Sequence, residues 1–331
     1  MKFIKGLCPV KKLLSYAFLS LFICGFVSCS LFQTTSQTSQ VQKVPLAEGE
    51  KRSVHEDWSD EYMITTQGPY SSMAGRQMFE QGGNVVDAAV AVSFTISVER
   101  PQSTGLGGGG FALLRWKKDT EKAARYHAVD FREKAPLQAH KDMYLDEEGK
   151  PVKNRSREGS LAVGVPGLVA GLLEMHQQYG ELSLKTVMEP AIKLAKNGFP
   201  VYPELAKALK YQEEVILKYP ETKEIFAPRG EILQLGDVLV QKDLANTLRL
   251  IVKEGKNGFY RNQTASRILK TLKKYDGLMS RGDLDNYDVK WREPISGTYK
   301  GNRVLSMPPP SSGGVHIIQI LNTIEEDDLG K

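Results

Sequence analysis

The pattern of apolar and polar positions predicts two consecutive helices near the start of the folded part of the chain. Residues 71–81 have helical spacing and are followed by a glycine pair, which tolerates the left-handed conformation of a helix end. Asn84 is a good N-cap for the next helix, and Asp87 places a carboxylate in its positive first turn. Residues 88–98 are apolar on nearly every face, so we expect this second helix to be buried all round.

A change of period predicts a β-hairpin directly afterwards. A glycine-rich loop at residues 105–110 leads into a strand at 111–116, and a polar turn connects it to a second strand at 125–133. Alternation along the second strand divides its side chains between two faces. One face is expected to carry Tyr126, Ala128, Asp130 and Arg132.

The remainder of the chain has mostly helical spacing and returns to strands near its end. Helices are predicted at residues 167–179, 184–197, 203–218, 241–254 and 263–274. Strands are predicted at 295–299 and 303–306, before a last helix that carries Ile317, Ile320, Leu321 and Ile324. The predicted elements thus include both helices and strands.

The first 28 residues have the three parts of an export signal. Lysines come first, an apolar run follows at residues 13–27, and small residues precede Cys29. The ending resembles a bacterial lipobox, although Phe26 stands where leucine is usual, so we predict lipidation of Cys29. An ordinary signal peptide cut nearby is the alternative. Either way, we expect an exported protein of the periplasm or cell envelope.

Composition supports the same division of the chain. Residues 29–57 are rich in Ser, Thr and Gln and predict a flexible tether, which leaves residues 58–331 as the folded body. The net charge is +5, but four lysines of the export signal account for most of it, so we expect no nucleic-acid partner. All three cysteines also precede residue 30, which excludes disulfide and thiol chemistry from the body.

The glycine-rich loop contains a dinucleotide-binding pattern at Gly105, Gly107 and Gly110, with Asp130 twenty residues later. The order of elements argues against that function, because the fingerprint requires a strand, then the loop, then a helix. Here the predicted helix comes first and the strand last. We therefore expect a loop whose backbone approaches another segment closely, and we predict no cofactor.

Metal and common hydrolase motifs are missing from the sequence. It has no G-x-S-x-G or H-E-x-x-H pattern, and its five histidines lack ligand spacing, so we predict no metal site. The remaining candidate is the sequence Asp-Phe-Arg-Glu at residues 130–133. An arginine between two acids is most often a solvated or structural ion-pair site.

Several stretches in register resemble the large subunit of gamma-glutamyltranspeptidases. They extend the similarity from about residue 63 to the end of the chain and lie at residues 82–91, 101–102, 106–111, 130–133, 135–136, 164–167, 258–260, 283–287 and 307–314. The set is far more specific than any one of its members.

The resemblance implies an N-terminal-nucleophile hydrolase fold, an αββα sandwich that would be incomplete in this chain. It also implies a precursor that cleaves itself and a small subunit that begins with a catalytic threonine. That threonine would attack the γ-amide of glutathione or a related compound, and the γ-glutamyl group would pass to water or to an amino acid.

The resemblance assigns one binding residue to this chain. Arg132 would hold the α-carboxylate of the γ-glutamyl group, and a planar guanidinium suits that task because it can donate two parallel bonds. The Thr-Thr-His type segment of the small subunit is not found, so we predict no catalytic residue here and no activity for the 331-residue chain alone. Two alternatives stay open: a non-catalytic surface lipoprotein that binds γ-glutamyl compounds or a partner, and a β-lactam acylase of the same superfamily.

Overall fold

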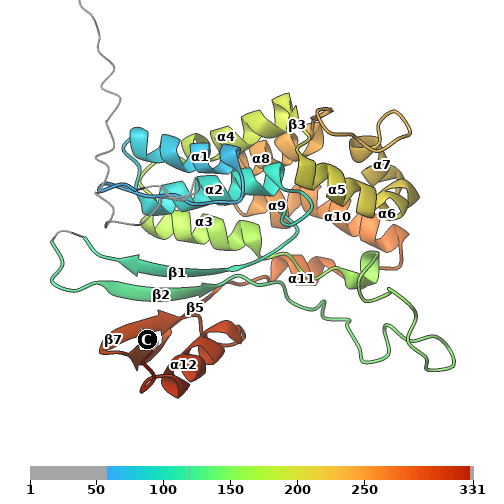
Figure 1. The fold of residues 1–331 in the computed structure, drawn as a ribbon. Helices are drawn as coiled ribbons and strands as arrows, with labels where there is room; N and C mark the ends of the chain where they lie inside the picture. The colour runs from blue at the N-terminus through green and yellow to red at the C-terminus, as the bar shows by residue number, and fades with distance from the viewer. Residues whose placement is uncertain (1–57, 119, 329–331) are drawn as a thin grey trace, which may run out of the picture. The chain divides into compact units, whose positions relative to one another are not determined.

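The computed structural model describes residues 58–118 and 120–328 (Figure 1). The chain divides into two units, residues 1–63 and 64–331, and the fold described here is that of the second. The predicted export signal, the tether and the lipidation site Cys29 lie outside the described residues. Within the described part, no helix is both long enough and apolar enough to cross a membrane.

The two predicted N-terminal helices are confirmed. Helix α1 is Pro69–Glu80 and α2 is Val85–Glu99, and Asn84 caps α2 by accepting bonds from the N–H groups of Val86 (2.8 Å) and Asp87 (3.1 Å). The carboxylate of Asp87 accepts the N–H of Asn84 in return at 2.9 Å. Helix α2 is buried on most of its surface, as its continuous apolar sequence predicts, because α1, α3 (Leu168–Tyr179) and α4 (Leu184–Asn197) pack against it.

Further helices follow along the chain (Figure 1). They are α5 (Pro203–Tyr211), α6 (Glu213–Lys218), α7 (Pro220–Phe226), α8 (Lys242–Glu254), α9 (Asn257–Tyr260), α10 (Asn262–Lys274) and α11 (Arg281–Asp285). The single helix predicted over residues 203–218 was wrong, because the chain breaks at Gln212. The buried positions Leu205, Leu209 and Ile216 keep a spacing that fits one helix, so the apolar pattern does not reveal the break.

The predicted hairpin forms two strands of a three-stranded antiparallel sheet with the order β1-β2-β5. Strand β1 is Phe111–Trp116, β2 is Arg125–Asp130 and β5 is Lys290–Arg292. Strand β2 ends three residues earlier than predicted. After Phe131, the chain leaves β1 and forms a bridge between Lys134 and Val165 instead. Strand β5 was not predicted, because three residues are too few to show a period.

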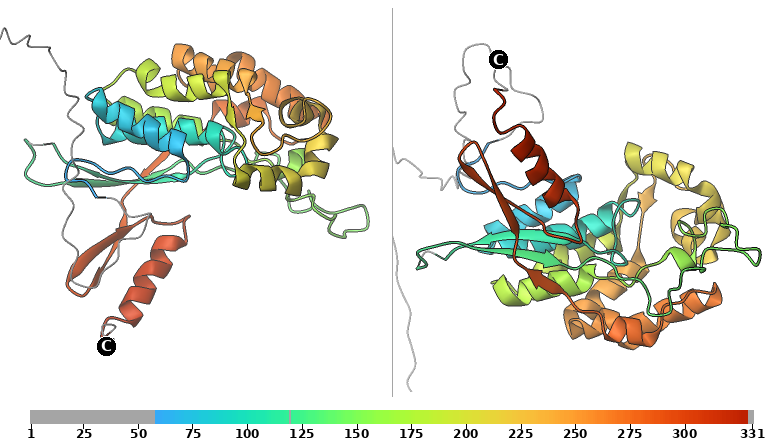
Figure 2. Two further views of the ribbon diagram at one scale, coloured as in Figure 1. Left: turned by 45° about the horizontal axis from the view of Figure 1, so that its top comes forward. Right: turned by 90° about the horizontal axis from the view of Figure 1, so that it is seen from below.

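The strands predicted near the end of the chain form a second hairpin, β6 (Ile295–Tyr299) and β7 (Asn302–Ser306). Helix α12 (Gly313–Thr323) packs on both strands. The remaining strands, β3 (Phe199–Pro200) and β4 (Val238–Leu239), form a short pair. Figures 1 and 2 show β6, β7 and α12 on the side of β1 and β2 that faces away from α1–α4.

Candidate functional site

Arg132 lies two residues beyond the end of β2, in the segment that carries the Asp-Phe-Arg-Glu sequence. The preceding residue, Phe131, is buried and exchanges two backbone bonds with Gly110, at 3.0 and 3.2 Å. This anchors the segment to the glycine-rich loop. The side chain of Arg132 is exposed, so the anchored backbone presents a guanidinium at the surface.

Both polar backbone groups of Arg132 are bonded to side chains. Its N–H donates to Oδ1 of Asp130 at 3.2 Å, and its carbonyl accepts the hydroxyl of Tyr287 at 2.8 Å. Burial raises the pKa of Tyr287, and the nearby carboxylates of Asp130, Glu133 and Asp288 raise it further. Tyr287 therefore remains protonated and keeps donating this bond.

Asp130 does not form an ion pair with Arg132, although only Phe131 separates them in sequence. Its Oδ2 accepts two bonds from Arg292 on β5, from Nε at 3.1 Å and from Nη2 at 2.8 Å. Sequence analysis missed Arg292, which is 162 residues from Asp130. No local signal could have found it, because the register of β2 against β5 brings the two residues together.

The guanidinium of Arg132 lies over the ring of Phe111, with Cζ 5.8 Å from the ring centroid. Within residues 58–118 and 120–328, it forms no ion pair with any acidic side chain. Within the described residues, the motif therefore does not form a structural ion pair through Arg132, whose side chain is exposed to solvent. The backbone of Arg132 is held in place and its planar guanidinium is exposed. The guanidinium can therefore donate two hydrogen bonds to a carboxylate from outside the chain.

The backbone of the glycine-rich loop lies directly against the Arg132 segment. This confirms the close approach to another segment that the sequence predicts. A Cβ added at Gly109 would lie 2.5 Å from the carbonyl oxygen of Phe131 and 2.8 Å from the nitrogen of Glu133. The carbonyl of Gly108 accepts the N–H groups of Gly167 and Leu168, each at 2.9 Å. The loop runs from α2 into β1, an order that does not place a helix N-terminus over a bound phosphate.

Asp283 fixes the chain that follows the motif. It caps α11 together with Ser280, and its Oδ1 accepts the N–H of Leu137 at 2.6 Å. Burial would raise the pKa of Asp283, but hydrogen bonds from Ser280 and from the Leu137 N–H outweigh that effect and lower it. Asp283 is thus an ionised anchor between α11 and the segment after Arg132.

Comparison with known proteins identifies the family. The sequence profile of gamma-glutamyltranspeptidase matches residues 71–331. The chain is 44% identical over 270 residues to the glutathione hydrolase proenzyme of Escherichia coli, which covers 81% of this chain and 46% of that protein. It belongs to the gamma-glutamyltranspeptidase family.

A solved structure and a further curated protein are also similar to this chain. The crystal structure of Helicobacter pylori gamma-glutamyltranspeptidase matches 83% of this chain and 77% of that chain with a TM-score of 0.78 and 44% identity. The acylase ACY 1 proenzyme of Pseudomonas sp. (strain V22) is 38% identical over 274 residues, which cover 81% of this chain and 48% of that protein. The chain thus spans about half the length of the curated relatives it matches. The predicted fold class, an α/β fold of the N-terminal-nucleophile hydrolase type, is confirmed.

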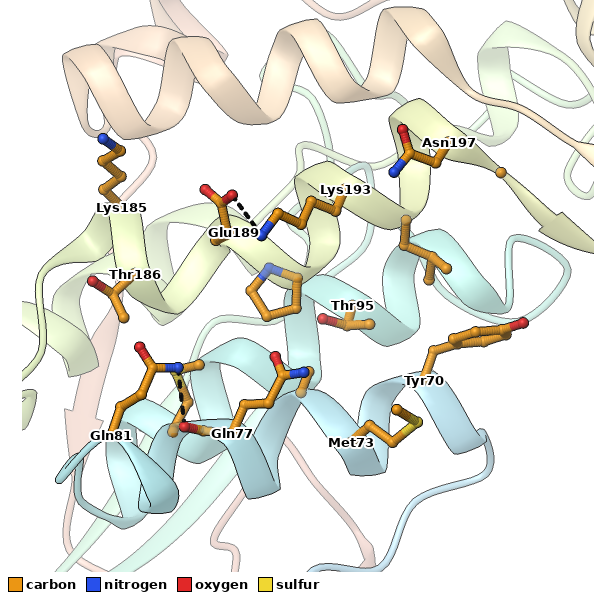
Figure 3. Close-up of a pocket in the computed structure, with 15 residues that line it drawn as sticks. Tyr70, Met73, Gln77, Gln81, Thr95, Lys185, Thr186, Glu189, Lys193 and Asn197 are labelled. Atoms are coloured by element: carbon orange, nitrogen blue, oxygen red, sulfur yellow. Dashed lines mark hydrogen bonds and ion pairs between the residues drawn. The ribbon is translucent and has the colours of Figure 1, made fainter. Parts of the chain in front are cut away.

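A groove of about 690 Å³ lies elsewhere, between α1 and α4 (Figure 3). Tyr70, Gln77 and Gln81 line one side and Glu189 and Lys193 the other. Its Lys193 is already paired with Glu189 at 3.0 Å, and no residue of the Asp-Phe-Arg-Glu segment lines it. The family motif therefore indicates the surface around Arg132, rather than this groove, as the candidate site.

Proposed function

We propose that this chain supplies γ-glutamyl recognition to an exported gamma-glutamyltranspeptidase. Such an enzyme would cleave the γ-glutamyl amide of glutathione or a related compound. The observation that carries the proposal is the state of Arg132: its backbone is bonded on both sides, and its guanidinium is exposed and pairs with no acid of the described chain. Membership of the family supports the same function.

Arg132 would bind the α-carboxylate of the substrate through two parallel N–H···O bonds. Charge-assisted bonds of this kind contribute about 1.5–3 kcal/mol each. The position of the guanidinium over Phe111 limits its rotation, which lowers the conformational entropy lost on binding. Arg132 is a binding residue in this proposal and takes no part in proton transfer.

The covalent step would need a small subunit that begins with threonine. Its hydroxyl oxygen would form an ester with the γ-carbonyl, its own amine would accept the proton, and the amine of the leaving group would depart with a proton. Water or the amine of an amino acid would then cleave the ester. Ile317 and Ile320 on α12 are exposed, as expected of a surface that a further part of the protein covers.

The proposed location is the cell envelope, with a lipid anchor at Cys29. Mass spectrometry of the native protein tests both processing steps at once. We expect a lipidated fragment that contains Arg132 and a smaller fragment that begins with threonine. A single inactive species without a threonine-initiated fragment would favour the alternative, a surface lipoprotein that binds γ-glutamyl compounds.

Substitution of Arg132→Lys in the full-length gene product tests the binding role. Lysine keeps the charge but loses one of two parallel bonds, so KM for a γ-glutamyl anilide should rise about tenfold to a hundredfold. The value of kcat and the melting temperature should change little, because the backbone bonds of residue 132 remain.

Arg125→Lys is the matched control. Arg125 lies at the far end of β2 and pairs with Glu121 at 2.8 Å, so its replacement perturbs the same strand without touching the site. Its KM should equal that of the wild type. An unchanged KM in the Arg132→Lys variant would contradict the assignment.

A further inference from the structure

Arg292 is bonded to Asp130, the acid next to the Arg132 segment. We infer that Arg292 is a positioning residue: by occupying the carboxylate of Asp130, it keeps the guanidinium of Arg132 available for the substrate. The inference rests on the proposed function in that the substrate it names is the α-carboxylate of a γ-glutamyl compound.

Asp130 lies close enough to Arg132 to compete for its guanidinium. Its Oδ1 is 3.2 Å from the backbone nitrogen of Arg132, and its side chain is only 8% exposed. An arginine side chain is long enough to fold back onto a carboxylate next to its own N–H. Burying a carboxylate without a neighbouring cation costs free energy. If nothing else neutralised Asp130, an ion pair between it and the guanidinium of Arg132 would therefore be favoured.

Arg292 removes that competition in the observed structure. It donates two bonds to Oδ2 of Asp130, at 3.1 and 2.8 Å, and leaves Oδ1 to the N–H of Arg132. Among the described residues, the hydrogen bonds that the Asp130 carboxylate accepts thus come from Arg292 and from the backbone N–H of Arg132. The guanidinium of Arg132 stays over Phe111.

Two lysines near Asp130 are engaged elsewhere and do not replace Arg292. Lys290, the register partner of Asp130 on β5, pairs with Oδ2 of Asp288 at 2.5 Å. Lys134 donates to the carbonyl of Asp288 at 2.9 Å and lies over the ring of Tyr287. If Arg292 is lost, the guanidinium of Arg132 is a cation nearby that is not already bonded to an acceptor.

The test is Arg292→Gln in the full-length gene product, assayed with a γ-glutamyl anilide. KM should rise roughly tenfold, because Asp130 now competes with the substrate for Arg132, while kcat stays within about twofold. Arg292→Lys should give an intermediate KM, since lysine keeps the positive charge but cannot donate the two hydrogen bonds that Arg292 donates to Asp130. The control Arg125→Gln loses an ion pair on the same sheet and should keep the wild-type KM.

A double variant separates this role from simple structural support. In Asp130→Asn with Arg292→Gln, no unpaired carboxylate remains, and the asparagine oxygen can still accept the N–H of residue 132. KM should return to within about threefold of the wild type. A KM that stays at the Arg292→Gln value, or that never rises in the single variant, would overturn the inference.

A failure of the proposed function can be distinguished from a failure of the inference about Arg292. If the wild-type protein neither cleaves the anilide nor binds L-glutamate in a calorimeter, the proposed function is wrong. A crystal structure of the Arg292→Gln variant then decides the inference about Arg292. A guanidinium of Arg132 on Asp130 would support it, and one that remains over Phe111 would refute it.

Discussion

Each polar group around Arg132 has a separate task. The Asp130 carboxylate binds the N–H of Arg132 and the fork of Arg292, and the Tyr287 hydroxyl binds the carbonyl of Arg132. The ring of Tyr287 stacks on Tyr260, with centroids 5.8 Å apart and planes 16° from parallel. The backbone at residue 132 is therefore fixed from two sides, while its side chain remains exposed to solvent.

Gly109→Ala should disturb this backbone. The added Cβ would meet backbone atoms of residues 131–133 at 2.5–3.0 Å, and backbone atoms cannot rotate away as a side chain can. We expect a loss of about 1–3 kcal/mol in the free energy of unfolding, measured by urea denaturation, together with a higher KM.

Gly107→Ala provides the comparison within the same loop. A Cβ at Gly107 meets no atom within 4 Å, so this variant should keep wild-type stability and KM. Equal effects at both positions would mean that the loop requires glycine for its flexibility rather than for close contact with the Arg132 segment.

Single elements were predicted best where their signals are local. The cap at Asn84 and the continuous apolar run identified α2, and the glycine-rich loop correctly preceded β1. The short elements α9, α11 and β5 were missed, because three to five residues complete barely one period. Strand β2 was predicted too long, because alternation continues in sequence after the chain has turned towards Val165.

Helix α11 should make stability depend on pH through Asp283. The pKa of this carboxyl is lower in the folded than in the unfolded chain, so it stabilises the fold above about pH 4. That contribution disappears as the pH falls through the folded pKa. Between about pH 5 and pH 3, the free energy of unfolding should therefore fall more steeply in the wild type than in Asp283→Asn.

Asp285→Asn is a suitable control for that measurement. Asp285 lies on the same short helix, but its ion pair with Arg261 is longer, at 3.6 Å, and largely open to solvent. Its replacement should leave the acid limb of the stability profile as steep as in the wild type. Parallel profiles for all three proteins would exclude Asp283 as the source of the acid sensitivity.

At the scale of the whole molecule, α12 covers the hairpin β6–β7 with one face and leaves another uncovered. Ile318 packs on Gly297, whereas Ile317 and Ile320 are exposed, the latter to 59%. Uncovered isoleucines on one helix favour association. Residues 58–331 expressed alone should therefore self-associate, and Ile320→Lys should reduce the association measured by light scattering.

Leu235→Lys tests whether any exposed apolar residue has the same effect. Leu235 is 63% exposed, but it lies in the connection between α7 and β4, away from α12 in sequence. It should leave self-association unchanged. A similar reduction by both variants would indicate a general effect of added charge rather than a specific surface on α12.

The sequence by itself determined the buried helix α2 with its cap at Asn84, the strand β1 and the close approach of the glycine-rich loop to another segment. These depend on spacing, capping and alternation, which act between residues near one another in the chain. Only the tertiary structure decided that Asp130 pairs with Arg292 and that Tyr287 binds the carbonyl of Arg132. Those partners are 162 and 155 residues apart, and no local pattern specifies which distant side chain a folded sheet brings against a carboxylate.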